Sequence, residues 1–285
     1  MKISVINTGY FKLDGGAMFG VVPKSIWSRT NPPDEKNMCT WAMRSMLIET
    51  DNKLILIDTG IGNKQSDKFF SYYYLHGDDC LEKSINKAGY GLDEVTDVFL
   101  THLHFDHCGG GVKWKDRDRK LLEPVFKNAH YWSNKAHWDW AINPNPREKA
   151  SFLTENLLPI QESGQLKFIH RENQITTNVF NDIDVFFADG HTESQMLPII
   201  NYNDQKIVFM ADLLPSTGHI PLPYVMGYDT RPLLTLKEKN EFIQLAEQQK
   251  WLLFLEHDPV NESCLLTQTE KGIRLKSTHQ LAEFM

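Results

Sequence analysis

The densest group of reactive side chains lies between residues 101 and 110, where the chain reads Thr-His-Leu-His-Phe-Asp-His-Cys-Gly-Gly. Three imidazoles and one carboxylate fall within six residues there, at His102, His104, Asp106 and His107. In an extended chain the first three side chains point to one face. His107 can join them after a turn, for which Gly109 to Gly111 offers backbone freedom. One loop is therefore expected to supply two groups of ligands, which suits two metal ions.

These ligand types favour Zn²⁺, with iron, Mn²⁺ or Co²⁺ as alternatives, and the absence of a Cys ligand argues against a purely structural zinc site. Five of the eleven histidines stand, with two aspartates, beside predicted strands. Histidines packed this tightly would lose hydration and would repel one another when protonated unless a metal used them. A metal role is therefore favoured over ordinary core or surface histidines.

The elements that must position these ligands are short apolar runs, each about as long as a buried strand and each followed by polar residues. They are Leu54–Ile57 before Asp58, Val98–Leu100 before His102, Val185–Phe187 before His191, Ile207–Met210 before Asp212, and Trp251–Leu255 before His257. Helical patterns are expected at residues 79–88 and 236–250. Strands mixed with helices predict helix-covered sheets, with the site along one sheet edge.

Composition narrows the class of protein. The 285 residues contain no repeat and no linker, which predicts a single domain over residues 1–285. There is no apolar run long enough to cross a membrane and no recognisable signal peptide. The net charge of −7 counts against a nucleic-acid partner. The four cysteines form no C-x-x-C pair and are expected to be free thiols in a reducing compartment, the cytoplasm.

The order of these motifs resembles the metallo-β-lactamase superfamily over nearly the whole chain. The segments that carry the resemblance are Ile57–Gly60, His102–His107, Asp189–Thr192, Phe209–Asp212 and Leu255–Asp258. The resemblance implies an α/β fold, classed as α+β in some schemes. The expected arrangement is a four-layer αβ/βα sandwich with a dinuclear site at the sheet edge.

The resemblance also implies a ligand set for each of two divalent ions. His102, His104 and His191 would hold the first ion, and Asp106, His107 and His257 would hold the second. Asp212 would bridge the two ions. Asp58 would brace the metal loop, which is residues 101–110, without binding metal. A bridging hydroxide is the implied nucleophile, because metal ions lower the pKa of bound water towards about 7. Asp106 is a candidate to relay a proton to the leaving group.

Further motifs narrow the substrate. The segments Leu13–Trp27, Ala211–Pro215, His219–Tyr224 and Gly227–Asp229 are similar to those of YtnP-type quorum-quenching lactonases, and the first is also similar to the methyl parathion hydrolase group. This implies an N-acyl homoserine lactone lactonase that opens a lactone or ester carbonyl in a small molecule. The alternatives are an organophosphate or aryl ester hydrolase on the same site, or a non-catalytic metal-binding protein of the same fold. By analogy with related lactonases, the chain could form a homodimer.

Apolar residues beside these motifs could line a pocket for an acyl chain, which would gain about 0.8 kcal/mol per buried methylene. The candidates are Met18, Phe19, Phe105, His219, Ile220, Leu222, Tyr224 and Met226. Core packing is the alternative for the apolar residues. His219 could donate a hydrogen bond to a substrate or ligand carboxylate, although an ordinary loop histidine is slightly preferred. Phe105 is the strongest candidate because it lies between two predicted ligands.

Two departures from the family pattern concern the residues around the ligands. Gln195 stands where many members carry a second His, but this position is not an expected ligand. Some lactonases have a Tyr shortly after the bridging Asp, whereas Leu213–Pro215 follow Asp212 in this chain. A phenol that stabilises the oxyanion must then come from elsewhere, with Tyr224 and Tyr228 as candidates.

Overall fold

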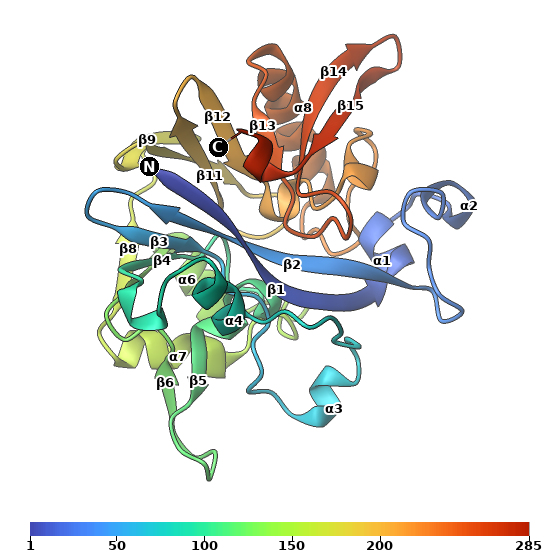
Figure 1. Cartoon of the computed structure of the whole chain (residues 1–285). Helices are drawn as coiled ribbons and strands as arrows, with labels where there is room; N and C mark the ends of the chain where they lie inside the picture. Colours follow the sequence, from blue (N-terminus) through green and yellow to red (C-terminus); the bar gives the residue numbers. More distant parts are fainter. Residues whose placement is uncertain (285) are drawn as a thin grey trace. The chain divides into compact units, whose positions relative to one another are not determined.

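The computed structural model describes residues 1–284 and divides the chain into two compact units. Unit 1 consists of Met1–Gly9 and Met43–Arg171, and unit 2 consists of Tyr10–Ala42 and the residues from Glu172 onward. Strands β1 (Lys2–Asp14) and β2 (Met38–Glu49) continue along the chain from one unit into the other (Figure 1). The single domain expected from the sequence stays a prediction.

The sheet of unit 1 has six strands in the order β1-β2-β3-β4-β7-β8. Strands β3, β4, β7 and β8 run parallel to one another, and β2 is antiparallel to β3. Strands β5 and β6 form a separate antiparallel pair. The bounds are β3 Leu54–Ile57, β4 Asp97–Phe99, β5 Val112–Trp114, β6 Leu122–Pro124, β7 His130–Asn134 and β8 Leu166–Ile169.

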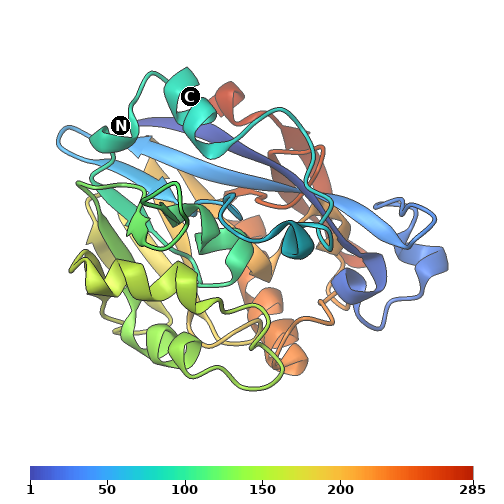
Figure 2. The same ribbon diagram turned by 90° about the horizontal axis from the view of Figure 1, so that it is seen from below.

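The helices of unit 1 bury their apolar side chains in the same core as its sheet. Ile85, Trp138 and Leu157 come from three different helices and belong to one buried cluster with Leu56 and Val98 of the strands. Figure 2 shows α6 and α7 in green to yellow-green. The helix predicted at residues 79–88 is confirmed as α4. The bounds are α3 Asp67–Phe70, α4 Leu81–Lys87, α5 Phe105–Cys108, α6 Lys135–Ile142, α7 Thr154–Glu162, and the 3-10 turns η1 Leu92–Glu94 and η2 Gly109–Gly111.

The predicted placement of polar residues at a sheet edge is confirmed in unit 1. All four side chains of β3 are buried, as expected for an apolar strand inside a largely parallel sheet. Strands β3 and β4 are in register, with Ile57 opposite Phe99. Their carboxyl ends therefore meet, and the backbone N–H of Thr101 donates to the Asp58 carboxylate at 2.8 Å.

The sheet of unit 2 has seven strands in the order β15-β14-β13-β12-β11-β10-β9. Strands β12 and β13 are parallel, with Phe209 opposite Phe254, while the other neighbouring pairs are antiparallel. The carboxyl ends of β12 and β13 therefore meet, and the loops that carry Asp212 and His257 start at the same edge. The bounds are β9 Ile175–Phe180, β10 Ile183–Ala188, β11 Gln195–Tyr202, β12 Gln205–Phe209, β13 Leu252–Phe254, β14 Ser263–Thr269 and β15 Gly272–His279.

Helix α8 packs on the sheet of unit 2 through Phe242 and Ile243, which share a buried cluster with Val208 and Leu253. It begins at Pro232, four residues before the predicted start at residue 236, because Pro in the first turn lacks only an N–H that would have no helical partner. The bounds are α1 Gly15–Phe19, α2 Lys24–Trp27, α8 Pro232–Gln248, and the 3-10 turns η3 Ala211–Leu213, η4 Thr217–His219 and η5 Leu281–Phe284.

The four cysteines are free, as expected: Cys39, Cys108 and Cys264 are buried and Cys80 is exposed. Burial raises the pKa of the Cys108 thiol to about 12, which keeps this thiol protonated beside the metal loop. Within residues 1–284, no helix is both long enough and apolar enough to span a bilayer.

Candidate metal centre

The metal loop of unit 1 turns earlier than its sequence suggests. The helical turn α5 starts at Phe105, so Asp106 and His107 lie on a helix. The prediction of an extended segment through Asp106 is therefore wrong. The physical reason is that one carbonyl, that of His104, accepts the backbone N–H groups of both His107 and Cys108 at 3.1 Å and closes the turn at once.

Positions 109 and 110 need glycine because there is no room for a Cβ atom. The prediction that the turn needs the backbone freedom of glycine is therefore wrong at these two positions. Gly109 has an ordinary helical φ of −61°. A Cβ atom on Gly109 would lie 2.3 Å from the Ile61 carbonyl oxygen, and one on Gly110 would lie 2.1 Å from the Thr59 carbonyl oxygen. Only glycine therefore lets the metal loop pack directly on the loop that follows β3.

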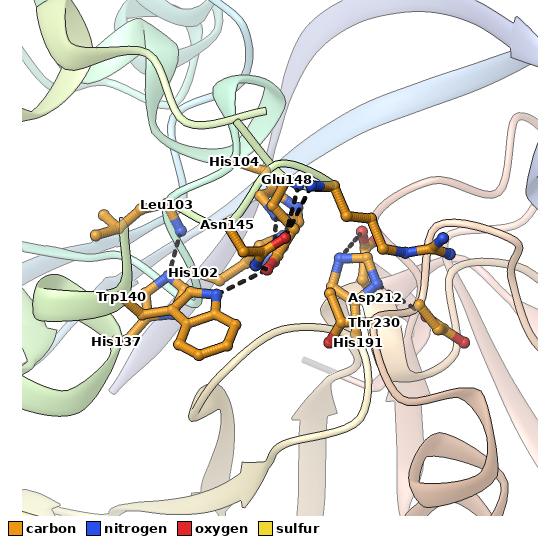
Figure 3. A network of polar contacts seen from close by, with 12 residues as sticks. His102, Leu103, His104, His137, Trp140, Asn145, Glu148, His191, Asp212 and Thr230 are labelled. Carbon is orange, nitrogen blue, oxygen red and sulfur yellow. Dashed lines mark hydrogen bonds and ion pairs between the residues drawn. The ribbon is translucent and has the colours of Figure 1, made fainter. Parts of the chain in front are cut away.

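His102 and His104 direct ring nitrogens at each other, with Nε2 of His102 3.1 Å from Nδ1 of His104 (Figure 3). The other nitrogen of His102, Nδ1, lies 3.2 Å from Thr101 Oγ1, whose own proton goes to Asp58 at 2.6 Å. The Thr101 hydroxyl can therefore only accept from His102. In each histidine, the outer nitrogen is the ring nitrogen that is not directed at the other predicted ligands, and the inner nitrogen is the one that is. The outer nitrogen of His104 is Nε2, which lies 3.4 Å from a Glu148 oxygen and donates to it. The two facing nitrogens are thus both lone pairs, which repel unless a cation lies between them.

Asp58 braces the metal loop, as the resemblance predicts. Its carboxylate accepts from the backbone N–H and the hydroxyl of Thr101 and lies 3.0 Å from Nδ1 of His107. His107 therefore carries its proton on Nδ1, which leaves the lone pair on Nε2, 3.8 Å from a carboxylate oxygen of Asp106. One buried carboxylate thus fixes both the path of the loop and the tautomer of a ligand.

In unit 2, Asp212 lies between two histidines. One of its carboxylate oxygens is 3.0 Å from Nε2 of His191, and the other is 3.1 Å from Nε2 of His257. All three side chains are buried, and Asp212 stands on η3, directly after β12. Two oxygens directed at two different imidazoles are the arrangement that a bridging carboxylate needs.

The outer nitrogens of these two histidines are also held. Nδ1 of His191 lies 3.0 Å from the Asp229 carboxylate, and Nδ1 of His257 lies 2.8 Å from the carbonyl oxygen of Ala42. Since a carbonyl can only accept, His257 carries its proton on Nδ1. Burial acts to lower the pKa of His191, but the carboxylates of Asp212 and Asp229 outweigh it and raise this pKa to about 10.

The residues fit divalent metal ions by their donor chemistry. Each of the five predicted histidine ligands has its outer nitrogen on an oxygen, which is the contact that metal-binding histidines usually make. The inner nitrogens are left to bind a metal, and Asp106 and Asp212 add carboxylate ligands. The buried His and Asp clusters are therefore consistent with a dinuclear metal site.

The predicted substrate-binding residues fall into two groups. In unit 1, the ring of Phe105 packs on Phe69 and Tyr73, with centroid distances of 5.4 Å and 4.7 Å. In unit 2, four of the predicted residues are buried and two are half-buried, namely Met18, Phe19, Ile220 and Met226 in the first set and Leu222 and Tyr224 in the second. Contact of these side chains with a substrate stays a prediction.

His219 is held within unit 2 through both ring nitrogens. Nε2 lies 3.0 Å from the carbonyl oxygen of Met18, and Nδ1 lies 2.7 Å from the hydroxyl of Ser216. Both ring nitrogens that could form a hydrogen bond with a substrate therefore already have a partner within the chain. This geometry supports the interpretation of His219 as a structural histidine and not as a substrate contact.

Sequence reasoning missed three residues that hold the ligands: His137, Glu148 and Asp229. Asp229 lies in a segment that carries the family resemblance, but nothing in the pattern gives it a role. His137 and Glu148 are separated by 34 and 44 residues from the loop residues that they contact, so no spacing rule pairs them. A single buried carboxylate or imidazole without a local motif carries no sequence signal of its partner.

Comparison with known proteins agrees with this site. The family model of the metallo-beta-lactamase superfamily matches residues 44–257. An N-acyl homoserine lactonase from Bacillus thuringiensis is 21% identical over 254 residues, which cover 84% of this chain and 90% of that protein.

Two solved structures are similar over almost the full length. A probable metal-dependent hydrolase from Staphylococcus aureus is 27% identical, with a TM-score of 0.85 and coverage of 98% of both chains. AidC, a dizinc quorum-quenching lactonase in complex with a product, N-hexanoyl-L-homoserine, is 22% identical, with a TM-score of 0.78, and the match covers 98% of this chain and 95% of AidC.

The chain belongs to the metallo-β-lactamase superfamily and has its α/β sandwich fold with two mixed sheets. It is a metal-dependent hydrolase of that superfamily, since the fold comes with the buried histidines and aspartates that the chemistry requires. The predictions of fold class, family and enzyme class are therefore confirmed.

Proposed function

We propose that the seven predicted ligands, four from unit 1 and three from unit 2, serve one dinuclear metal centre of a lactone-opening enzyme. The observation that carries the proposal is the set of outer-nitrogen contacts, which holds one nitrogen of each of five imidazoles on an oxygen and leaves the inner nitrogen as the position where a metal would bind. Membership of the family supports joining the two ligand sets. Zinc is the first expectation for both ions, because imidazole and carboxylate ligands suit it.

Bound there, the two ions would supply a hydroxide from water at neutral pH and would polarise the carbonyl under attack. The chain's own residues would hold the ions and transfer the proton. Asp212 is directed at histidines on both of its oxygens, which suits it to hold two ions together. Asp106 is buried, at 8% exposure, and is the carboxylate that we assign to pass a proton to the leaving alkoxide.

The proposed substrate is an N-acyl homoserine lactone. Support comes from the lactonases among the similar proteins and from the lactonase-like motifs of the sequence. Phe105 precedes Asp106 in the chain and packs on Phe69 and Tyr73, so we expect this aromatic cluster to form an apolar wall beside Asp106. Such a wall suits an acyl chain better than it suits a charged substrate.

The test is ring opening of homoserine lactones with short and long acyl chains, followed by titration of the acid released. An aryl ester and a phosphotriester are assayed on the same preparation. We expect lactone turnover that chelation abolishes and added Zn²⁺ restores. Turnover should be lost in His102→Ala but not in His170→Ala, which alters an exposed histidine. Turnover of only the ester or the phosphotriester would overturn the lactone assignment, and no turnover of any of the three would favour a non-catalytic metal-binding protein.

A further inference from the structure

The chain segment from Asn134 to Phe152 contacts three consecutive residues of the metal loop. The backbone N–H of Leu103 donates to Nε2 of His137 at 2.8 Å, and the backbone N–H of Phe105 donates to the carbonyl oxygen of Ser151 at 3.0 Å. Between them, the outer nitrogen of His104 faces Glu148 at 3.4 Å (Figure 3). This segment therefore holds the metal loop on both sides of one predicted ligand.

Glu148 is fixed in place by its second oxygen. Oε2 accepts from Nε1 of Trp140 at 2.7 Å and from Nδ2 of Asn145 at 2.6 Å (Figure 3). Oε1 is thereby directed to His104, and the side chain is only 3% exposed. A buried carboxylate is costly unless donors and a positive partner compensate it. Trp140 and Asn145 are two neutral donors that meet part of that need, and a metal-bound imidazole would add a positive partner.

We infer that Glu148 is a positioning residue that fixes the tautomer and the orientation of His104, and so sets the affinity of one metal ion of the pair. The inference rests on the dinuclear centre proposed above. A carboxylate on the outer nitrogen keeps the proton on Nε2 of His104 and the lone pair on Nδ1, where the metal would bind. It also makes the imidazole a stronger ligand.

The variant Glu148→Gln tests this role with little change of volume. Its single oxygen cannot serve both sides. If the oxygen stays with Trp140 and Asn145, the amide NH₂ faces His104, and His104 can accept from it only by moving its own proton to Nδ1. That tautomer cannot bind a metal through Nδ1. The exposed Glu162→Gln, on α7, is the matched control.

The first measurement is the pair of Zn²⁺ dissociation constants, obtained by competition with a chromophoric chelator. We expect one of the two constants to weaken by about 10- to 100-fold in Glu148→Gln while the other is unchanged, and Glu162→Gln to match the wild type. Unchanged constants in a folded Glu148→Gln protein would overturn the inference. Equal weakening of both constants would also overturn it, since it would point to a general loss of structure.

The second measurement does not depend on bound metal. In zinc-free protein, ¹⁵N NMR of the His104 ring should show a proton on Nε2 in the wild type and a proton only on Nδ1 in Glu148→Gln. An identical tautomer in both proteins would overturn the inference. Trp140→Phe removes one donor to Glu148 but keeps the carboxylate, and should weaken the same Zn²⁺ constant to a smaller extent. This variant tests the role of Glu148 if Glu148→Gln does not fold. If wild-type protein binds no Zn²⁺, the dinuclear centre itself fails, and the NMR result still reports on Glu148.

Discussion

The imidazole of His219 lies flat on the ring of Phe19, with centroids 4.3 Å apart and planes 5° apart. This stack, with the bonds of His219 to the Met18 carbonyl and to Ser216, ties α1 to the 3-10 turn η4. The carbonyl of Met18 can only accept, so Nε2 of His219 carries a proton, and because burial lowers the pKa of the ring to about 3, Nδ1 stays unprotonated and accepts from the Ser216 hydroxyl. His219 is therefore neutral in the folded protein.

The neutral state of His219 should make the protein sensitive to acid. Burial lowers the pKa of His219 from 6.5 to about 3, with the nearby Lys239 charge acting in the same direction. Below pH 6.5 the His219 ring binds a proton in the unfolded chain but not in the folded chain. The free energy of unfolding therefore falls as pH drops from about 6.5 towards 3. Between pH 7.5 and pH 5, urea unfolding of the wild type should lose about 2 kcal/mol more than that of His219→Gln. His170→Gln should behave as the wild type, and an equal loss in wild type and His219→Gln would contradict the account.

Lys239 should stabilise the loop that carries His219 and Tyr224. Its buried ammonium donates to the carbonyl oxygens of Pro221 at 3.1 Å and Tyr224 at 2.9 Å, and also to that of His219. Lys239→Met leaves these carbonyls without their donor and should lower the free energy of unfolding by about 1–3 kcal/mol. Lys237→Met, on the exposed face of the same helix, should change it by less than about 0.5 kcal/mol. Equal effects of the two substitutions in denaturant titrations would show that the hydrogen bonds from Lys239 to these carbonyls contribute nothing to stability.

Gly110→Ala should disturb the metal loop through the backbone. The added methyl group would lie 2.1 Å from the Thr59 carbonyl oxygen, and neither backbone segment can move without shifting the Asp58 brace. We expect a loss of about 1–3 kcal/mol in the free energy of unfolding, together with a lower Zn²⁺ content. Gly91→Ala is the control, because its Cβ would lie 3.4 Å from the nearest atom, a flexible side-chain oxygen of Glu94. A Gly110→Ala protein with wild-type stability would contradict the packing described for this loop.

Phe105→Ala should separate substrate binding from metal binding. The ring packs on Phe69 and Tyr73, whereas the backbone N–H of Phe105 is held by Ser151 whatever its side chain. The KM for long-chain lactones should rise by about tenfold, which corresponds to losing the burial of about two methylene groups, while the Zn²⁺ content stays unchanged. Steady-state kinetics over a series of acyl lengths checks this. The same rise in KM for the shortest and the longest acyl chains would exclude Phe105 from the acyl pocket.

The residues that could be predicted from the sequence are those with a local pattern. The ligands of the metal loop and the brace at Asp58 stand next to apolar strands, and parallel pairing of β3 with β4 brings them together without further information. The start of α5 at Phe105 could not be predicted, because it depends on which N–H groups the His104 carbonyl accepts. Glu148 and Asp229 reach their histidines across 44 and 38 residues, and only the folded chain selects those pairs.

The number of metal ions per chain tests the dinuclear centre most directly. Elemental analysis of protein loaded with Zn²⁺ and then dialysed should find about two ions per chain in the wild type. Asp212→Ala should hold fewer, because both of its oxygens face histidines. His170→Ala should hold as many as the wild type. One ion or none in the wild type under every loading condition would contradict the dinuclear centre.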